Sequence, residues 1–596
     1  MSARLLPTPF GRLAAFSEED LNLSANVAKL RVRDEDFLVA SMIERCPKTM
    51  MIRELLKNAM EAAAAETGVA GRVEFSPLNL GEVTKLAIWN TGRGLTAAEL
   101  DQMCDIASSI RKETGLDRNF GMGAKVAALP SNQLGMRYRS AHEGTVHEVV
   151  IGKYDGVYGR LLRADAEGAM AGVLPATEAA AAEGRDAAGE WTEVVLMGND
   201  EQQNTVTDPY NGNPRSPAAW LYEAVRGRFF RFPANLDIVF CRGIAGLRDD
   251  RSLVSTADSL AALEQYEAVR TPEGIVIHYA FDPRLVDQTV RHPSMPWASN
   301  EGRLALVHRD ECYGVLRGAL WLKESPSFGI PFLARGISIL IELPDDYPVL
   351  TDAYREFLRY RNDRQDQVKP NDFAALVVKH QPAWLIELLA SAMPDADYLD
   401  DVLAEMSLLL EEMGVALRRP GQAPRFAPPR APDPERERER EGEPEPPPFK
   451  AEKPPAILLL RNSADVSERG LTYRAAAYYP ETHQLHVNLL YPAVTDVAQS
   501  LASWERPELD LEGVRLAAQL AAERSMVARV ARSLAYGLAK RGRPREWADG
   551  HLRVVFSSEA LTLAADDIRT GQAEIEAIFN EALKAVGPAA APDEAA

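Results

Sequence analysis

The sequence predicts an α+β protein built from three successive α/β domains, and three observations support this class. Apolar residues recur at helical spacing over residues 52–63, and an apolar run at residues 86–89 then predicts a buried strand. Strand patterns followed by helix patterns continue through the second third of the chain. Residues 416–455 are rich in proline, glutamate and arginine and almost lack aliphatic side chains, so they cannot bury a core. We therefore predict domains at residues 1–200, 201–415 and 456–590, with a disordered linker at 416–455.

The composition is typical of a soluble globular protein. The chain has 596 residues, of which 46% are hydrophobic and 26% charged, enough for about three domains. Its net charge of −20 argues against a protein coated in nucleic acid. No signal sequence or membrane-crossing run is visible, so we expect a cytoplasmic protein without a membrane partner. The cysteines form no C-x-x-C pair, which indicates reduced thiols: Cys46, Cys104, Cys241 and Cys312.

The helix predicted at residues 52–63 carries two polar side chains suited to nucleotide chemistry. Its apolar positions share one face, whereas Glu54 and Asn58 lie one turn apart on another. A carboxylate can take a proton from an attacking water, and an amide oxygen can hold Mg²⁺. Such a pattern more often marks a solvated helix face, so its meaning depends on the segments that follow.

Three further segments accompany this helix. The strand at residues 86–89 runs into Asn-Thr-Gly-Arg-Gly at residues 90–94, and a second glycine turn at residues 119–125 opens a helix with Lys125 in its first turn. Glycines at such a turn allow backbone N–H groups to approach phosphates, and a lysine adds positive charge there. A later strand pattern, residues 191–196, carries the hydroxyl of Thr192.

These four segments, in this order, resemble the motifs of the GHKL ATPases, which share the Bergerat fold. The resemblance covers residues 40–200 and is to the branch with gyrase B, the ninety-kilodalton heat-shock chaperones, MutL and the microrchidia (MORC) proteins, rather than to histidine kinases. The segment with Glu54 and Asn58 resembles the family's E-x-x-x-N box, and residues 90–94 resemble its D-x-G-x-G box. The resemblance implies a Bergerat-type α/β sandwich, followed by a transducer-like middle domain.

The same resemblance implies Mg²⁺-dependent ATP binding and slow hydrolysis that drives a dimer-closing switch, chaperone-like or clamp-like. Glu54 would be the catalytic base and Asn58 the magnesium ligand. One position departs from the family pattern, because Asn90 stands where the family has an aspartate that accepts from the adenine amino group. Asparagine retains an oxygen acceptor, so ATP remains the favoured nucleotide. The implied cofactor-binding residues are Asn58, Asn90, Gly92, Gly94, Asn119, Gly121, Gly123, Lys125 and Thr192.

Other functions remain open at this stage. A nucleotide-binding scaffold without turnover would also fit, and so would a DNA-engaging clamp of the MORC or MutL kind, although the acidity disfavours nucleic acid. A protein kinase is disfavoured, because a histidine kinase needs its phosphoacceptor before the first motif and the first histidine is His142. We expect a homodimer, with its association set by nucleotide; the sequence does not identify a client protein.

The remaining sequence predicts further elements. Transducer-like domains often send one cation to the γ-phosphate, and Lys323, Arg335, Arg359 and Arg361 are the candidates. A capping box predicts a helix start at Thr96. Three more elements are predicted from periodicity: a helix at residues 351–361, a long amphipathic helix at 512–541 and a strand at 552–556.

Overall fold

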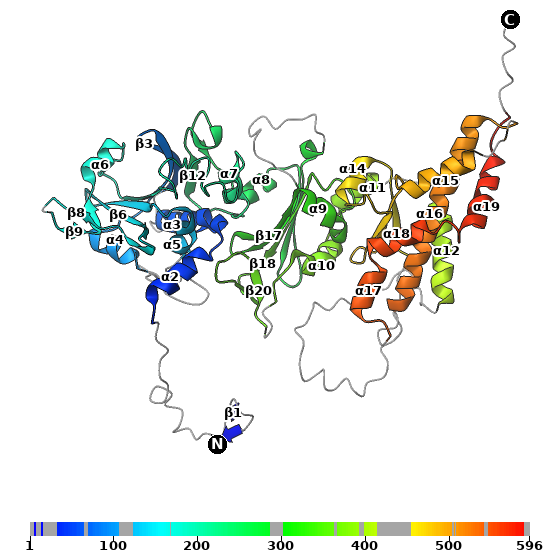
Figure 1. The fold of residues 1–596 in the computed structure, drawn as a ribbon, viewed down its shortest axis with the longest axis horizontal. Coiled ribbons are helices and arrows are strands. Elements are labelled where there is room, and N and C mark those ends of the chain that lie inside the picture. Colours follow the sequence, from blue (N-terminus) through cyan, green and yellow to red (C-terminus); the bar gives the residue numbers. More distant parts are fainter. Residues whose placement is uncertain are drawn as a thin grey trace, which may run out of the picture. The chain divides into compact units, whose positions relative to one another are not determined.

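The contacts within the computed structural model divide the chain into two units, each with its own sheets and helices (Figure 1). The N-terminal unit contains residues 1–217 and 235–252, and the C-terminal unit contains residues 218–234 and 253–596. The predicted α+β class is therefore confirmed. The residues that the structure describes are 5–7, 13–15, 33–64, 70–105, 123–166, 168–286, 302–362, 366–392, 398–413, 454–503, 506, 508–541 and 546–588.

The described part of the N-terminal unit is organised on one nine-stranded sheet. The strand order is β10-β6-β5-β11-β4-β3-β12-β13, and β7 pairs with β6. Neighbours are antiparallel except for β3 and β12, which are parallel. The strands are β3 (Gly71–Leu80), β4 (Val83–Thr91), β5 (Met136–His142), β6 (Thr145–Tyr154), β7 (Val157–Arg160), β10 (Val173–Pro175), β11 (Trp191–Leu196), β12 (Leu236–Phe240) and β13 (Arg251–Ser252). Two separate pairs are β1 (Leu5–Pro7) with β2 (Leu13–Ala15), and β8 (Arg163–Ala164) with β9 (Met170–Ala171).

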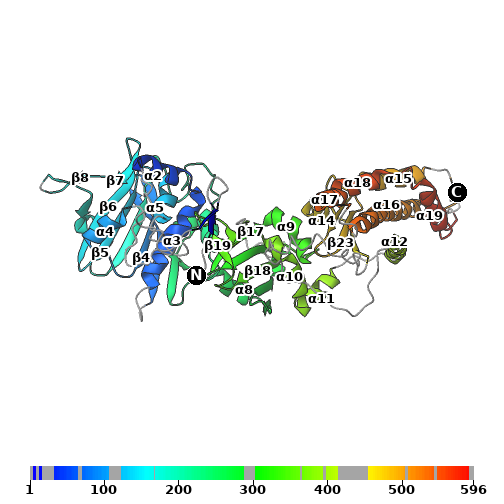
Figure 2. The same cartoon turned by 90° about the horizontal axis from the view of Figure 1, so that it is seen from below.

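Helix α3 (Met51–Ala64) forms the core of this unit, because it packs on β3 and β4 and against α5 (Figure 2). The apolar stripe predicted from the sequence is buried: Ile52, Leu55, Leu56, Ala59 and Ala63 are each at most 5% exposed. The other helices of the unit are α2 (Glu35–Glu44), α4 (Ala97–Met103), α5 (Gly123–Ala128) and α6 (Thr177–Ala182), with 3-10 turns η2 (Lys48–Met50), η3 (Leu129–Ser131) and η4 (Ile244–Gly246).

Helix α4 begins where the sequence predicts. The Thr96 hydroxyl accepts from the Glu99 N–H, and the Glu99 carboxylate accepts in return from the Thr96 N–H. This reciprocal pair satisfies two of the N–H groups that a helix start leaves free.

Strand β12 joins the N-terminal sheet although it follows residue 200, where the sequence suggests a boundary. It runs parallel to β3, with Leu236 opposite Gly71 and Phe240 opposite Phe75. The two phenyl rings of that last pair meet edge to face, 5.3 Å apart. An exposed strand edge leaves a row of N–H and C=O groups without partners. At the edge of β3, strand β12 supplies those hydrogen-bond partners.

The first part of the C-terminal unit surrounds a five-stranded sheet in the order β14-β15-β18-β16-β17. Its core is aliphatic and aromatic, and Trp321 is the largest of its fully buried side chains. The strands are β14 (Gln265–Arg270), β15 (Val276–Phe281), β16 (Arg303–His308), β17 (Glu311–Arg317), β18 (Ile337–Leu343) and the separate pair β19 (Val349–Thr351) and β20 (Leu358–Tyr360). The helices are α7 (Trp220–Arg226), α8 (Thr256–Ala261), α9 (Gly318–Glu324), α10 (Ala374–Lys379) and α11 (Ala383–Ser391), with η5 (Pro283–Leu285), η6 (Ser325–Phe328) and η7 (Pro370–Phe373).

The rest of the C-terminal unit packs helices around a three-stranded sheet in the order β21-β23-β22. The long helix predicted at residues 512–541 is confirmed as α16 (Leu511–Arg541), and it packs against α12, α15, α18 and α19. The strands are β21 (Ala456–Leu460), β22 (Ala476–Tyr479) and β23 (Gln484–Asn488). The helices are α12 (Leu399–Glu412), α14 (Ser463–Glu468), α15 (Pro492–Ala502), α17 (Asp549–Val555), α18 (Ser558–Asp566) and α19 (Gln572–Leu583). The predicted linker, 416–455, lies outside the described residues except for its last two positions.

Two predicted elements are wrong. Residues 351–361 form the β19–β20 pair rather than a helix, because the Asp352 carboxylate accepts from the N–H groups of Tyr354 and Phe357 and holds a turn. Residues 552–556 end helix α17 rather than forming a strand. Their valines favour a strand locally, but the Phe556 ring packs on Tyr478 and the Leu552 side chain is buried, so tertiary packing overrides that preference.

Candidate functional site

The first and third motifs meet at Glu54. Its carboxylate lies on the first turn of α3 and is almost buried, with 8% of the residue exposed. A Cβ placed on Gly123, the first residue of α5, would lie only 1.9 Å from the Glu54 Oε2 atom. Any side chain at Gly123 would therefore displace the carboxylate. Asn58, one turn further along α3, is exposed, so its amide faces solvent beside this contact.

Arg53 is a partner of Glu54 that the sequence analysis missed. Its guanidinium donates to Glu54 Oε1, and the arginine is 4% exposed. Consecutive helix residues project about 100° apart, so the helical pattern alone does not place these side chains together. The guanidinium thereby orients the carboxylate next to Gly123.

The second and fourth motifs are direct neighbours in the sheet. Asn90 on β4 is opposite Thr192 on β11, and Thr192 is in turn opposite Ser140 on β5. Residues opposite each other project to the same face, which here is the face with the buried Leu86 and Ile88. The Thr192 and Ser140 hydroxyls are 2.9 Å apart, and the Asn90 amide donates to the Thr91 carbonyl. The result is a cluster of neutral hydrogen-bonding groups.

The glycines of the second motif are required by close packing. Gly92 has a φ of +114°, and a Cβ there would lie 2.3 Å from the Ala62 carbonyl oxygen near the end of α3. A Cβ on Gly94 would lie 1.7 Å from the Ala141 carbonyl oxygen on β5. The turn after β4 thus passes close to the backbone of α3 on one side and of β5 on the other. These contacts fix the end of β4, where Asn90 lies, against α3.

Lys125 lies on α5, two residues beyond Gly123, and its ammonium contacts the end of another helix. It donates to the carbonyls of Met103 and Asp105 at the C-terminus of α4. Carbonyls at a helix C-terminus favour a cation. Burial lowers the pKa of Lys125 to about 8, although the nearby Cys104 and Asp105 act in the opposite direction.

Two of the expected phosphate-binding residues, Asn119 and Gly121, lie outside the described residues, within 106–122. The expectations for these two positions therefore stay predictions. The cations suggested for the γ-phosphate lie in the C-terminal unit and mostly have local partners. Arg335 pairs with Glu468 at 2.6 Å, and Arg361 donates to the Val349 carbonyl. Arg359 lies over the Phe357 ring, and Lys323 is exposed on α9.

A buried lysine, also missed from the sequence, ties β4 to the loop after β11. The Lys85 ammonium is 2.7 Å from the Gln203 carbonyl and 2.8 Å from the Met197 carbonyl, and the lysine is 3% exposed. Burial lowers its pKa. A single lysine within an apolar strand could have been recognised as an internal ammonium with carbonyl partners.

No family model matches the chain, and no curated protein matches its sequence. Among the described residues, none of the helices is both long and apolar enough to span a bilayer. In the same part of the chain, no group of three or more histidine, cysteine or acidic side chains is arranged to hold a metal ion.

Proposed function

We propose that the N-terminal unit binds Mg²⁺ and ATP in a Bergerat-type site and hydrolyses the nucleotide slowly. The observation that carries this proposal is the contact between Gly123 and the Glu54 carboxylate, which brings together two motifs far apart in the sequence. Asn90 and Thr192, from the other two motifs, are opposite each other in the sheet on which α3 packs. Their juxtaposition supports one composite site.

In this proposal Glu54 accepts a proton from a water that attacks the terminal phosphorus, and the bond to the bridging oxygen breaks to give ADP and phosphate. Asn58 would supply an amide oxygen to Mg²⁺, an ion that typically takes one or two protein ligands and otherwise phosphate and water oxygens. The exposed position of Asn58 suits that partial coordination. The ion would neutralise charge on the phosphates.

The neutral cluster would bind the base. Adenine offers both donors and acceptors on its edge, and the Asn90 amide and the hydroxyls of Thr192 and Ser140 can complement either kind. Gly123 and Lys125 would lie nearest the phosphates, with Asn119 and Gly121 completing that turn. In this arrangement Lys125 would exchange its contacts with the α4 carbonyls for a contact with phosphate.

A second candidate function is a nucleotide-binding scaffold without turnover. It is favoured by one observation: the Glu54 carboxylate is already paired with Arg53, so one of its oxygens contacts a guanidinium rather than a water. In that case nucleotide binding would order the site, but the nucleotide would not be hydrolysed.

Phosphate release with and without Mg²⁺ separates these functions. We expect Glu54→Gln to lower the rate by about 100-fold, the range that a general base supplies, while calorimetry with a non-hydrolysable ATP analogue still detects binding. Asn58→Ala should weaken Mg²⁺-dependent binding. Glu61→Gln, on the same helix, is the matched control and should leave both properties unchanged.

Each other outcome has a definite meaning. Turnover that survives Glu54→Gln contradicts the catalytic role of this carboxylate. Binding of the analogue without any turnover by the unmodified protein favours the scaffold. Failure to bind the analogue at all contradicts both candidates.

The dimer-closing switch is a further part of the proposal and rests on the sequence resemblance. A solution mass that doubles when the analogue is added would support it, whereas an unchanged mass would contradict it. A salt-dependent gel shift seen only with the analogue would favour the DNA-clamp alternative.

A further inference from the structure

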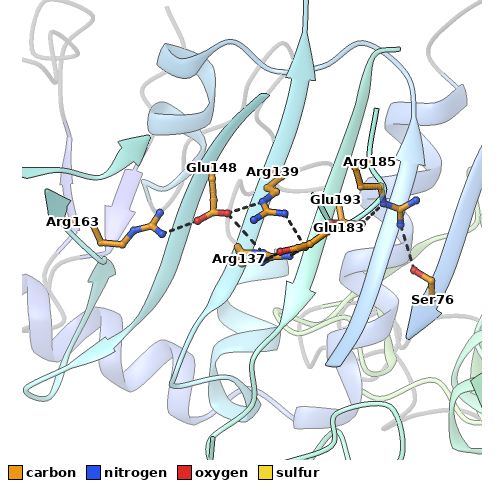
Figure 3. A network of polar contacts seen from close by, with 8 residues as sticks. All are labelled: Ser76, Arg137, Arg139, Glu148, Arg163, Glu183, Arg185 and Glu193. Atoms are coloured by element: carbon orange, nitrogen blue, oxygen red, sulfur yellow. Dashed lines mark hydrogen bonds and ion pairs between the residues drawn. The ribbon is translucent and has the colours of Figure 1, made fainter. Parts of the chain in front are cut away.

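The sheet of the N-terminal unit has a second polar cluster on the face opposite Asn90 and Thr192. Side chains alternate along a strand, so Arg137 and Arg139 on β5 project away from the side that Ser140 faces. They line a cavity of about 450 Å³ together with Glu148 and Arg163. Figure 3 shows these four side chains linked on one face of the sheet.

The cluster contains one more cation than anion. Glu148 pairs with Arg139 at 2.6 Å and with Arg163 at 2.7 Å, and Glu183 pairs with Arg137 at 2.6 Å and with Arg139 at 2.8 Å. Burial opposes ionisation of Glu148, but hydrogen bonds from Arg163 and Arg139 outweigh it, so the pKa of Glu148 is lowered. Three guanidinium groups therefore face two carboxylates.

Several guanidinium nitrogens in this cluster are buried without a hydrogen-bond partner among the described residues. They are Nε of Arg137 and both Nε and Nη2 of Arg163. Arg137 is 8% exposed, and its Nε is 4.0 Å from Glu148, too far for a hydrogen bond. A buried donor without a partner costs about 1–3 kcal/mol and more when it is charged. The donors and the surplus positive charge both favour an additional anion.

The rest of the cavity lining is apolar. It includes Val150, Leu174 and Met197. A cavity of this size lies within the range of about 300–1,000 Å³ that is typical of small-molecule sites. Inorganic anions would leave most of this wall in contact with water, whereas a ligand with an apolar body would cover it.

We propose that this cavity binds a small organic carboxylate, with its carboxylate on Arg137 and Arg163 and its apolar body against Val150 and Leu174. A planar guanidinium matches a carboxylate through two parallel hydrogen bonds, which explains why arginines rather than lysines line the site. The proposal is independent of nucleotide hydrolysis, because the cavity and the candidate nucleotide site use opposite faces of the sheet.

Calorimetry on the full chain, without nucleotide, tests this site with benzoate as the organic carboxylate and sulfate as an anion without an apolar body. We expect one benzoate site and weaker sulfate binding. Arg163→Gln should weaken benzoate binding by at least about tenfold, because the two parallel hydrogen bonds from its guanidinium to the carboxylate are lost. Arg163→Lys keeps the positive charge but loses the planar pair of donors. Its benzoate affinity should lie between those of the unmodified protein and Arg163→Gln.

Arg72→Gln is the matched control. Arg72 lies on β3 of the same sheet, pairs with Glu74 at 2.7 Å, and its side chain is 40% exposed, against 41% for Arg163. Each change removes one positive charge; Arg163→Gln loses the ion pair with Glu148, and Arg72→Gln loses the pairs with Glu74 and Asp237. Arg72→Gln therefore removes no less local electrostatic interaction, so weaker benzoate binding in Arg163→Gln alone indicates a site at Arg163. Benzoate affinity should be unchanged in Arg72→Gln.

The proposal would be overturned by no benzoate binding to the unmodified protein, by equal weakening in Arg163→Gln and Arg72→Gln, or by sulfate binding as tightly as benzoate. Displacement of benzoate by the ATP analogue would also overturn it, because the probe would then occupy the other face. A chain that binds benzoate but not nucleotide would leave this inference standing and contradict the proposed function.

Discussion

The two faces of the N-terminal sheet handle buried polar groups in different ways. On the face against which α3 packs, the polar groups are neutral: Asn90, Thr192 and Ser140. On the other face, residues one position away along the same strands form ion pairs: Arg139 is next to Ser140, and Glu193 is next to Thr192. Arg185 joins Glu193 and also covers the ring of Trp89.

This difference shows what each face tolerates. Neutral groups can exchange one hydrogen-bond partner for another at small cost, so the neutral face can remain open to a ligand. A buried ion pair is stabilising only while both partners remain, because removal of one partner leaves an uncompensated charge. The charged face is therefore held rigidly, and the neutral face is adaptable.

The largest expected effect comes from breaking the charged face. Arg139→Met removes the arginine shared by Glu148 and Glu183, and we expect the free energy of unfolding to fall by about 3 kcal/mol. Urea titration measures this. The half-exposed Arg72→Gln should cost less than about 1 kcal/mol, as exposed pairs do. Equal losses in the two variants would show that burial does not distinguish these ion pairs.

A smaller effect is expected at the contact between Gly123 and Glu54. Gly123→Ala should displace the flexible carboxylate rather than unfold the protein, since the Cβ would meet a side chain and not backbone. A misplacement of about 1 Å can cost about 100-fold in rate, so phosphate release should fall by up to that factor. Gly159→Ala on β7, where a Cβ meets nothing within 4 Å, is the control. An unchanged rate of phosphate release in Gly123→Ala would contradict the proposed role of Glu54 in hydrolysis.

The smallest effect concerns pH. The pKa of Lys125 is about 8 in the folded protein against 10.5 as its ordinary value, so between these values the unfolded chain binds more protons. Stability contributed by this group therefore rises with pH from about 8 to 10.5. The difference in unfolding free energy between the unmodified protein and Lys125→Met should change over that range and stay constant between pH 6 and 7. If this difference in unfolding free energy stayed constant up to pH 10.5, the lowered pKa of Lys125 would be contradicted.

Much of the local structure follows from sequence patterns. The apolar stripe of α3, the capping box at Thr96 and the length of α16 depend on residues near one another in the chain, so periodicity and capping chemistry identify them. The positions of Glu54 and Asn58 on one helix were predictable for the same reason. The failures at residues 351–361 and 552–556 occur where a turn hydrogen bond or distant packing outweighs local preference.

Local sequence patterns were sufficient to predict α3, the start of α4 and the long helix α16. The three-dimensional fold was needed to reveal that β12 pairs with β3, that Arg53 contacts Glu54, and that Arg137, Arg139 and Arg163 share two carboxylates. The physical reason is that burial and pairing of charges depend on residues far apart in the chain. The energy of a buried ion pair depends on every charged or polar group near it in the fold. A hydrophobic pattern, in contrast, can be recognised within a single segment of the chain.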